Sequence, residues 1–161
     1  LDFAVGRLPD GLQSEVLAFS PMETEPIALI ARYGHPLLRK PDPLKPMQLL
    51  EFDWVMPGPD NLLTRTVLAR LQLLGLPRPT QRVFTASFLL TLALLQQSDA
   101  IAAVSLASAR QFASGAAAGF ELLPIDLAIA VEPYGMITRA RVSLPPTSQR
   151  LCDLIRQAVP G

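Results

Sequence analysis

Short apolar segments alternate with helical segments along the chain, and this alternation constrains the fold more than any other feature of the sequence. Most of the strand-like segments are apolar on both faces and lack a strict alternation of apolar and polar residues: 2–5, 26–31, 54–56, 82–85, 101–104, 121–123 and 135–139. That pattern is typical of parallel strands covered on both sides rather than of a half-exposed antiparallel sheet.

Helical segments separate these strands, and residues that favour helix ends mark their limits. Asp60-Asn61 can cap a first helix, whose apolar positions recur every three or four residues at Leu63, Val67, Leu71 and Leu74. Gly75 and Pro77 end it. Ser87 opens a second helix over 88–97, and a third runs over about 106–113. The last begins at Pro146, with an expected inner stripe of Leu151, Leu154, Ile155 and Ala158. Strands and helices in alternation predict an α/β fold with a parallel sheet.

The composition fits a chain with a sizeable core, in one domain or two small lobes. Half of the 161 residues are hydrophobic and 17% are charged, which argues against disorder. Proline and glycine concentrate at 36–46 and 124–135, and we expect the chain to pass between lobes there. Residues 1–5 resemble a buried strand with no earlier strand to pair with, so we expect the chain to be a fragment that lacks an N-terminal part.

Charge and hydropathy exclude several classes of function. The 14 basic and 14 acidic residues give no net charge, whereas a domain that grips nucleic acid usually has a basic excess. No apolar run reaches the ~18 residues that cross a bilayer, and no signal peptide is visible. The single cysteine excludes an internal disulfide and fits a cytoplasmic location.

The residues that catalysis or metal binding would need are scarce. A nucleophile requires an oriented base, but the only histidine, His35, lies between Gly34 and Pro36 without a visible partner. Cys152 lies on or beside the inner stripe of the last helix, where a buried, inert thiol is the simpler interpretation. His, Cys, Asp and Glu show no metal-ligand spacing, and the glycines form no phosphate-binding or dinucleotide motif. We therefore expect no enzyme activity, no metal and no cofactor.

Three places could bind a small molecule. Gly6 to Asp10 follow the first strand, so Arg7 lies at a strand end, where it could hold a carboxylate or pair with a nearby acid. The segment 57–61 joins a strand to a helix, as does 85–87. Free backbone N–H groups at such corners attract anions, although each corner taken alone is more often a simple helix cap.

The order of these segments resembles the effector-binding domain of LysR-type transcriptional regulators over nearly the whole chain. The matching pieces are Leu1-Asp2-Phe3-Ala4-Val5-Gly6, the run 25–31 followed by Gly34-His35-Pro36-Leu37-Leu38, Phe84-Thr85-Ala86-Ser87, Asp99-Ala100-Ile101-Ala102-Ala103-Val104 and Glu121-Leu122-Leu123-Pro124. Gly6-Arg7-Leu8-Pro9, 97–101 and 133–139 are similar to the branch that regulates protocatechuate breakdown and galactose uptake.

This resemblance implies a fold of two Rossmann-like lobes, similar to type II periplasmic binding proteins, with the effector bound between them. Lobe I would comprise 1–31 and 126–161, incomplete at its N-terminus, and lobe II would comprise 32–125. The family's ligand contacts carry over to Pro57, Gly58, Asn61, Thr64, Thr85 and Ser87, with Arg7 at the cleft-facing end of the first strand. The implied partners are a small effector (an aromatic-derived carboxylate or a sugar), a homodimer or homotetramer, and DNA through a winged helix-turn-helix that this sequence lacks.

The sequence departs from the family pattern at one turn, and two other functions are alternatives to the resemblance. Ser98 and Asp99 stand where many relatives have glycine, and Asp tolerates the tight turn. A periplasmic-type solute-binding protein would share the two-lobed architecture, and an enzyme on a similar scaffold would need a catalytic residue that the sequence does not offer.

Overall fold

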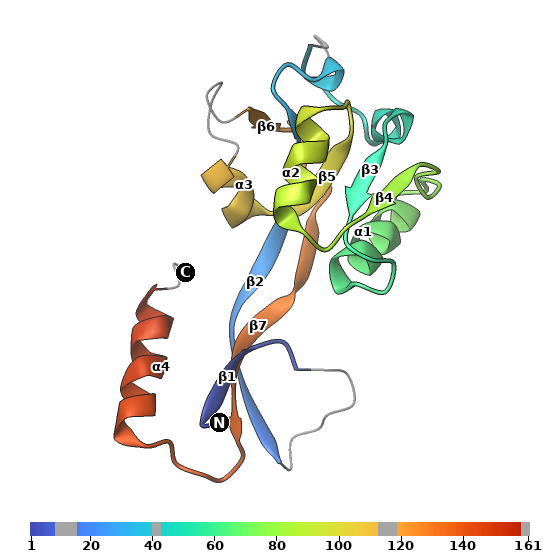
Figure 1. Ribbon diagram of the computed structural model, residues 1–161. Coiled ribbons are helices and arrows are strands. Elements are labelled where there is room, and N and C mark those ends of the chain that lie inside the picture. Colours follow the sequence, from blue (N-terminus) through green and yellow to red (C-terminus); the bar gives the residue numbers. More distant parts are fainter. Residues whose placement is uncertain (9–15, 40–42, 113–118, 159–161) are drawn as a thin grey trace. The chain divides into compact units, whose positions relative to one another are not determined.

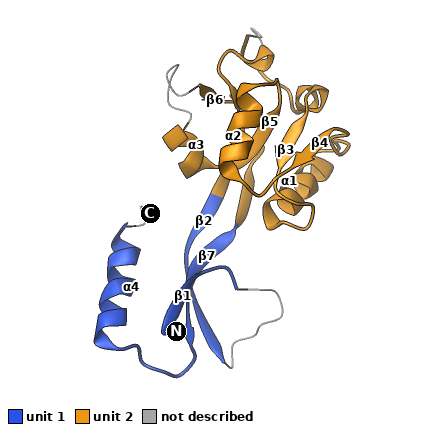
Figure 2. Cartoon of the chain, viewed as in Figure 1, with its two compact units in different colours: residues 1–25, 132–161 blue, residues 26–131 orange. Residues whose placement is uncertain are grey.

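The computed structural model describes residues 1–8, 16–39, 43–112 and 119–158, which form two compact units (Figures 1 and 2). Unit 1 comprises Leu1–Glu25 and Glu132–Gly161, and unit 2 comprises Pro26–Val131. The segment 36–46, expected between lobes, lies inside unit 2, whereas 124–135 does contain a boundary. Pro9 and Asp10 of the first candidate loop lie outside the described residues.

The sheet of unit 2 is mixed rather than all parallel. In the middle of it β3 (Trp54–Met56) pairs in parallel with β4 (Arg82–Phe84) and with β5 (Ile101–Ser105). The long strand β2 (Leu17–Arg32) pairs antiparallel with β5 and with β6 (Phe120–Leu122). The prediction of parallel pairing is therefore right for β3, β4 and β5 and wrong for β2 and β6. Leu29 and Ile30 are buried on opposite faces of β2, so this antiparallel strand has the two-sided apolar pattern of a parallel one.

Helices cover both faces of this sheet, which accounts for that burial. On one face lie α1 (Leu62–Leu73) and two short 3₁₀ helices, Pro36–Arg39 and Pro46–Glu51, around a core that includes Leu49, Trp54, Met56, Val67 and Leu71. On the other face lie α2 (Phe88–Gln96) and α3 (Leu106–Phe112), around a core that includes Ile30, Val55, Leu95, Ala102 and Val104. Unit 2 is thus a three-layer α/β structure.

Unit 1 combines antiparallel strands with one helix. The strand β1 (Phe3–Gly6) pairs with the distal part of β7 (Ile129–Arg139), so that Phe3 is opposite Thr138 and Gly6 is opposite Gly135. The helix α4 (Pro146–Ala158) buries Cys152, while Leu151 and Leu154 are about half exposed. The inner stripe predicted for α4 is therefore wrong at these two leucines and at Ala158, which is exposed, while Ile155 is half-buried. Both β2 and β7 run from one unit into the other.

Candidate functional site

The two strand-to-helix corners predicted from the sequence lie next to each other in unit 2. In the parallel register Met56, the last residue of β3, is opposite Phe84, the last residue of β4. The backbone N–H of Thr85 then donates to the carbonyl of Met56 at 2.9 Å, which fixes the start of the second corner against the first. Because the carboxyl ends of parallel strands are where α/β sheets bind ligands, this edge of unit 2 is the candidate site.

The first corner presents backbone and an exposed amide. Asn61 caps α1, and its side-chain oxygen accepts the N–H of Leu63 at 2.9 Å. Gly58 has open space where a side chain would be, and its carbonyl accepts the N–H of Asn61 at 2.9 Å. The amide nitrogen of Asn61 therefore stays available at an accessible corner.

Thr64 differs from the other predicted ligand residues of this corner. Its side chain is 1% exposed, and its hydroxyl donates to the carbonyl of Pro57 at 3.0 Å. This hydrogen bond ties the first turn of α1 to the loop that precedes it. Contact of Thr64 with a ligand stays a prediction, but in this structure the hydroxyl has a structural partner.

The second corner is built from two hydroxyls. Thr85 Oγ1 accepts the N–H of Ser87 at 3.1 Å, and Ser87 Oγ accepts the N–H of Leu90 at 3.3 Å, which caps α2. Thr85 is half-buried and Ser87 is exposed. Both hydroxyls keep their own hydrogen, so each can still donate to an acceptor on a ligand.

Arg7 belongs to unit 1, where an acid already binds its guanidinium. Nη2 forms an ion pair with Glu25, and Nε donates to the carbonyl of Glu132 at 2.9 Å. These contacts join the end of β1 to β2 and β7 at the residues that border the second unit. The sequence left an anionic ligand and a nearby acid equally open for Arg7, and here the acid is present.

A cavity of about 420 Å³ lies in unit 2 beside the two strands that cross between the units. Such a volume is in the range of small-molecule sites. Its lining comes from the second half of β2, the first residue of α3, the end of β6, the segment that follows β6 and the start of β7: Pro26, Ile27, Ala28, Leu106, Leu122, Leu123, Ile125, Asp126, Ala128, Ile129 and Ala130. The sequence prediction missed these residues because it interpreted 124–135 as a connection between lobes.

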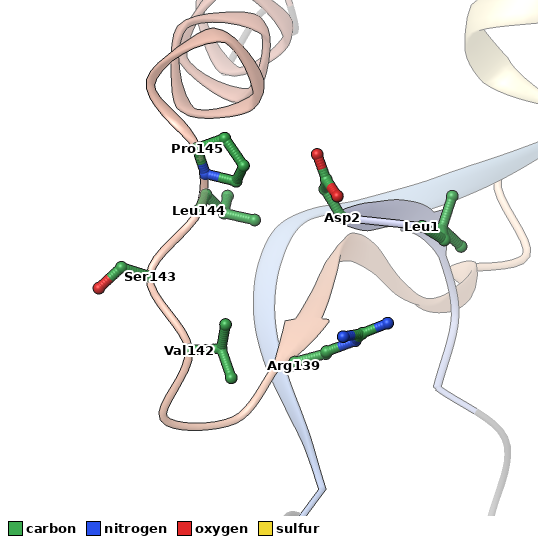
Figure 3. Close-up of a pocket in the computed structure, with 7 residues that line it drawn as sticks. All are labelled: Leu1, Asp2, Arg139, Val142, Ser143, Leu144 and Pro145. Atoms are coloured by element: carbon green, nitrogen blue, oxygen red, sulfur yellow. The ribbon is translucent and has the colours of Figure 1, made fainter.

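A second, small pocket of about 50 Å³ lies in unit 1 between the N-terminus and the loop that precedes α4 (Figure 3). It is lined by Leu1, Asp2, Arg139 and residues 142–145. The carboxylate of Asp2 accepts the hydroxyl hydrogen of Ser148 on α4. A volume of this size holds little more than a water molecule.

His35 is fully buried and has two hydrogen-bond partners. Nε2 donates to the carbonyl of Asp99 at 2.8 Å, and Nδ1 accepts the N–H of Leu37 at 3.1 Å, while the ring packs on Phe52. Burial lowers the pKa of His35, and this effect outweighs the hydrogen bond to Asp99, which raises it. The ring is therefore a neutral connector between two turns.

Among the described residues, no three His, Cys, Asp or Glu side chains are grouped so that they could hold a metal ion. Nor does that part of the chain contain a helix long and apolar enough to span a bilayer.

A three-layer α/β unit with polar corners at the carboxyl edge of its parallel strands, and a mostly apolar cavity elsewhere in the same unit, has the form of a small-molecule-binding domain. The chain belongs to the family of LysR substrate-binding domains, whose model matches residues 1–160.

Relatives and solved structures agree with this membership. The chain is 28% identical over 158 residues to the HTH-type transcriptional regulator GbpR of Azospirillum brasilense, covering 98% of this chain and 46% of that protein. It is 29% identical over 160 residues to the HTH-type transcriptional regulator GalR of Pseudomonas putida, covering 99% of this chain and 39% of that protein. The chain therefore spans less than half the length of these relatives.

Solved structures share the fold. The regulatory domain of CcmR from Synechocystis PCC6803, in complex with 2-PG, matches with a TM-score of 0.73 and 18% identity over 97% of this chain and 72% of that one. The BenM effector-binding domain with its effector benzoate matches with a TM-score of 0.70 and 20% identity over 98% of this chain and 68% of that one. These are effector-binding domains of the type II periplasmic-binding-protein fold, which confirms the predicted fold class.

Proposed function

We propose that this chain is the effector-sensing domain of a LysR-type DNA-binding transcriptional regulator. The observation that carries this proposal is the adjacency of the two corners in unit 2, which the hydrogen bond from Thr85 to Met56 fixes at the carboxyl edge of the parallel strands. Family membership supports it and favours it over a periplasmic-type solute-binding protein.

The proposed ligand contacts are backbone and side-chain donors of these corners, namely Pro57, Gly58, Asn61, Thr64, Thr85 and Ser87. Arg7 contributes a cation in unit 1 if an anionic effector displaces or shares its contact with Glu25. Effector classes that this set could hold are an aromatic-derived carboxylate and a sugar. No residue of the proposed site has a catalytic role.

The mechanism we propose is a shift between states of lobe closure. An effector that binds one state better than another shifts the equilibrium by the ratio of its two affinities. In the whole regulator, which we propose to be a cytoplasmic homodimer or homotetramer, that shift would change the spacing of DNA-binding domains located outside this chain.

A thermal-shift screen tests the proposal. The library contains aromatic acids, phenols, muconate-like dicarboxylates, lactones and simple sugars. A ligand at 100 times its Kd stabilises by ~2.7 kcal/mol, a shift of several degrees. Thr85→Val should abolish the shift. Thr66→Val is the matched control, because the Thr66 hydroxyl donates to the carbonyl of Leu62 within α1. A library without any active compound, or equal effects of the two variants, would contradict the proposed site.

A further inference from the structure

The cavity beside the crossing strands has a lining that restricts the chemistry of an occupant. We propose that it binds the apolar ring of a small effector, with a hydroxyl of that effector donating a hydrogen bond to the carboxylate of Asp126. This proposal rests on the effector-binding function proposed above. It keeps the ring of the aromatic-derived class and gives that ring a hydroxyl in place of the carboxylate.

The walls of the cavity favour a hydrocarbon ring over a sugar. Leucine, isoleucine, alanine and proline make up the described lining apart from Asp126. A sugar placed there would turn hydroxyl groups toward walls on which, among the described side chains, Asp126 alone can bind them, and a polar group left without a partner is costly to bury. An aromatic or alicyclic ring instead removes apolar surface from water on both sides of the contact.

The charge of the lining favours a hydroxyl over a carboxylate on that ring. Among the described residues that line the cavity, Asp126 is the one that carries a charge. Its Oδ1 accepts the N–H of Ala128 at 2.7 Å, and a carboxylate offers further lone pairs for a second donor. A ligand carboxylate at the same place would meet a like charge, which suppresses binding.

The segment that carries Asp126 is held in place by bonds outside the cavity, so the lining is formed before a ligand arrives. The N–H of Leu123 donates to the carbonyl of Leu29 at 2.9 Å, which extends the β6–β2 pairing by one residue. Arg70 on α1 donates from Nε to the carbonyl of Leu127. A preformed site loses less conformational entropy on binding.

The position of the cavity gives an occupant a route to the crossing strands. Pro26 and Ile27 of β2 are the first residues of unit 2. Ile129 and Ala130 of β7 directly precede Val131, the last residue of unit 2. A ligand in the cavity therefore contacts both strands where they leave the unit. Binding in the cavity therefore favours the conformation of these two connecting segments that contacts the ligand best.

Isoleucine methyl resonances of the protein localise binding to this cavity. We would titrate ¹³C-methyl-labelled protein with phenol, toluene and benzoate, which share a ring and differ in its substituent. Phenol is expected to bind with a roughly millimolar Kd and to shift the methyl signals of Ile27, Ile125 and Ile129. Those of Ile101 and Ile155, outside the cavity, should not move. Benzoate should bind at least tenfold more weakly at these methyls, and toluene should be intermediate.

Two variants and one control complete the test. Ala130→Leu narrows the cavity and should weaken phenol at least tenfold, whereas Ala107→Leu, at an exposed position of α3, should not change it. Asp126→Asn keeps an oxygen for the N–H of Ala128 but removes the charge, and it should raise the affinity for benzoate about tenfold.

Benzoate or toluene binding at these methyls as tightly as phenol would overturn the proposed ligand class. Phenol shifts confined to other residues, or unaffected by Ala130→Leu, would overturn the cavity as the site. Either result is distinct from failure of the proposed function, which would leave the whole thermal-shift library without an active compound.

Discussion

His35 connects two turns that are far apart in the sequence, and it does so only as a neutral ring. Nδ1 faces the N–H of Leu37, so a proton added there would place two donors against each other. The charges of Asp99 and Arg32, which form an ion pair with each other, act on the ring in opposite directions. Stability should therefore depend on the protonation of this single histidine.

Replacement of His35 should remove part of the pH dependence of the free energy of unfolding. Folding lowers the pKa of His35. At a pH well above the ordinary value of about 6.5, His35 is neutral in both the folded and the unfolded chain, and its contribution to the free energy of unfolding is at its maximum. As the pH falls through about 6.5, the unfolded chain gains a proton that the folded one excludes, and stability declines until the lowered folded pKa is reached. Urea unfolding of the parent and of His35→Gln between pH 5.5 and 7.5 checks this. The variant should be less stable at pH 7.5 and show a flatter profile, and parallel profiles would contradict the assignment.

The ion pair of Arg7 with Glu25 separates a structural role of Arg7 from a ligand-binding one. Both side chains are about one-third exposed, so the pair should contribute about 1 kcal/mol or less to stability. If Arg7 also binds an anionic effector, Arg7→Ala should weaken it by more than tenfold, because a lost charge-assisted hydrogen bond costs about 2 kcal/mol. Isothermal titration calorimetry with an anionic compound from the thermal-shift screen measures this affinity. Glu25→Gln, which keeps the guanidinium of Arg7, is the control. Equal affinity of parent and Arg7→Ala would remove Arg7 from the site.

At the scale of elements, Gly135 shows where two strands approach too closely for a side chain. A Cβ at Gly135 would overlap the backbone carbonyl of Ser20 and the ring of Phe19, whereas Gly6, opposite it on β1, has open space. Gly135→Ala should therefore destabilise the protein by about 1–3 kcal/mol through overpacking, and Gly6→Ala should change it little. The midpoints of denaturant unfolding of Gly135→Ala and Gly6→Ala measure this difference. Equal midpoints would contradict a close contact between Gly135 and β2.

Most element positions could be predicted from local residues, because caps and apolar periodicity act over a few positions. Asn61 and Ser87 indeed begin α1 and α2, and β3 has its predicted bounds. The direction of β2 could not be predicted, since two-sided burial of Leu29 and Ile30 follows from the helices on both faces whichever way the strand runs. Its full length was also missed, because Pro21 and Pro26 interrupt the apolar pattern.

The candidate site was predictable only as far as it is local. The two corners each lie within a few residues of a strand end, and their adjacency follows from parallel pairing. The partner of Arg7 lies eighteen residues further along the chain, and the cavity draws residues from 26–28, 106 and 122–130. Contacts between such distant segments depend on the tertiary fold and leave no local pattern.

At the scale of the whole molecule, the balance of basic and acidic residues predicts that this chain by itself binds DNA weakly. With 14 basic and 14 acidic residues, it lacks the basic excess that neutralises phosphates and drives salt-dependent DNA binding. A fluorescence-anisotropy titration of a 30-base-pair duplex with the purified chain should show Kd weaker than about 10⁻⁴ M at physiological salt. Tight binding that weakens steeply with added salt would contradict this.

The way the chain is divided between the units has a consequence for recombination. Unit 2 is one uninterrupted stretch, Pro26–Val131, whereas unit 1 is made from the two segments that flank it. A chimera that exchanges unit 2 with that of a relative therefore needs two junctions, one inside β2 and one inside β7. A one-residue shift at either junction would turn every later side chain of that strand to the opposite face. The ligand contacts proposed for unit 2 should thus be transferable together as one segment, without Arg7 of unit 1, provided that both junctions preserve strand register.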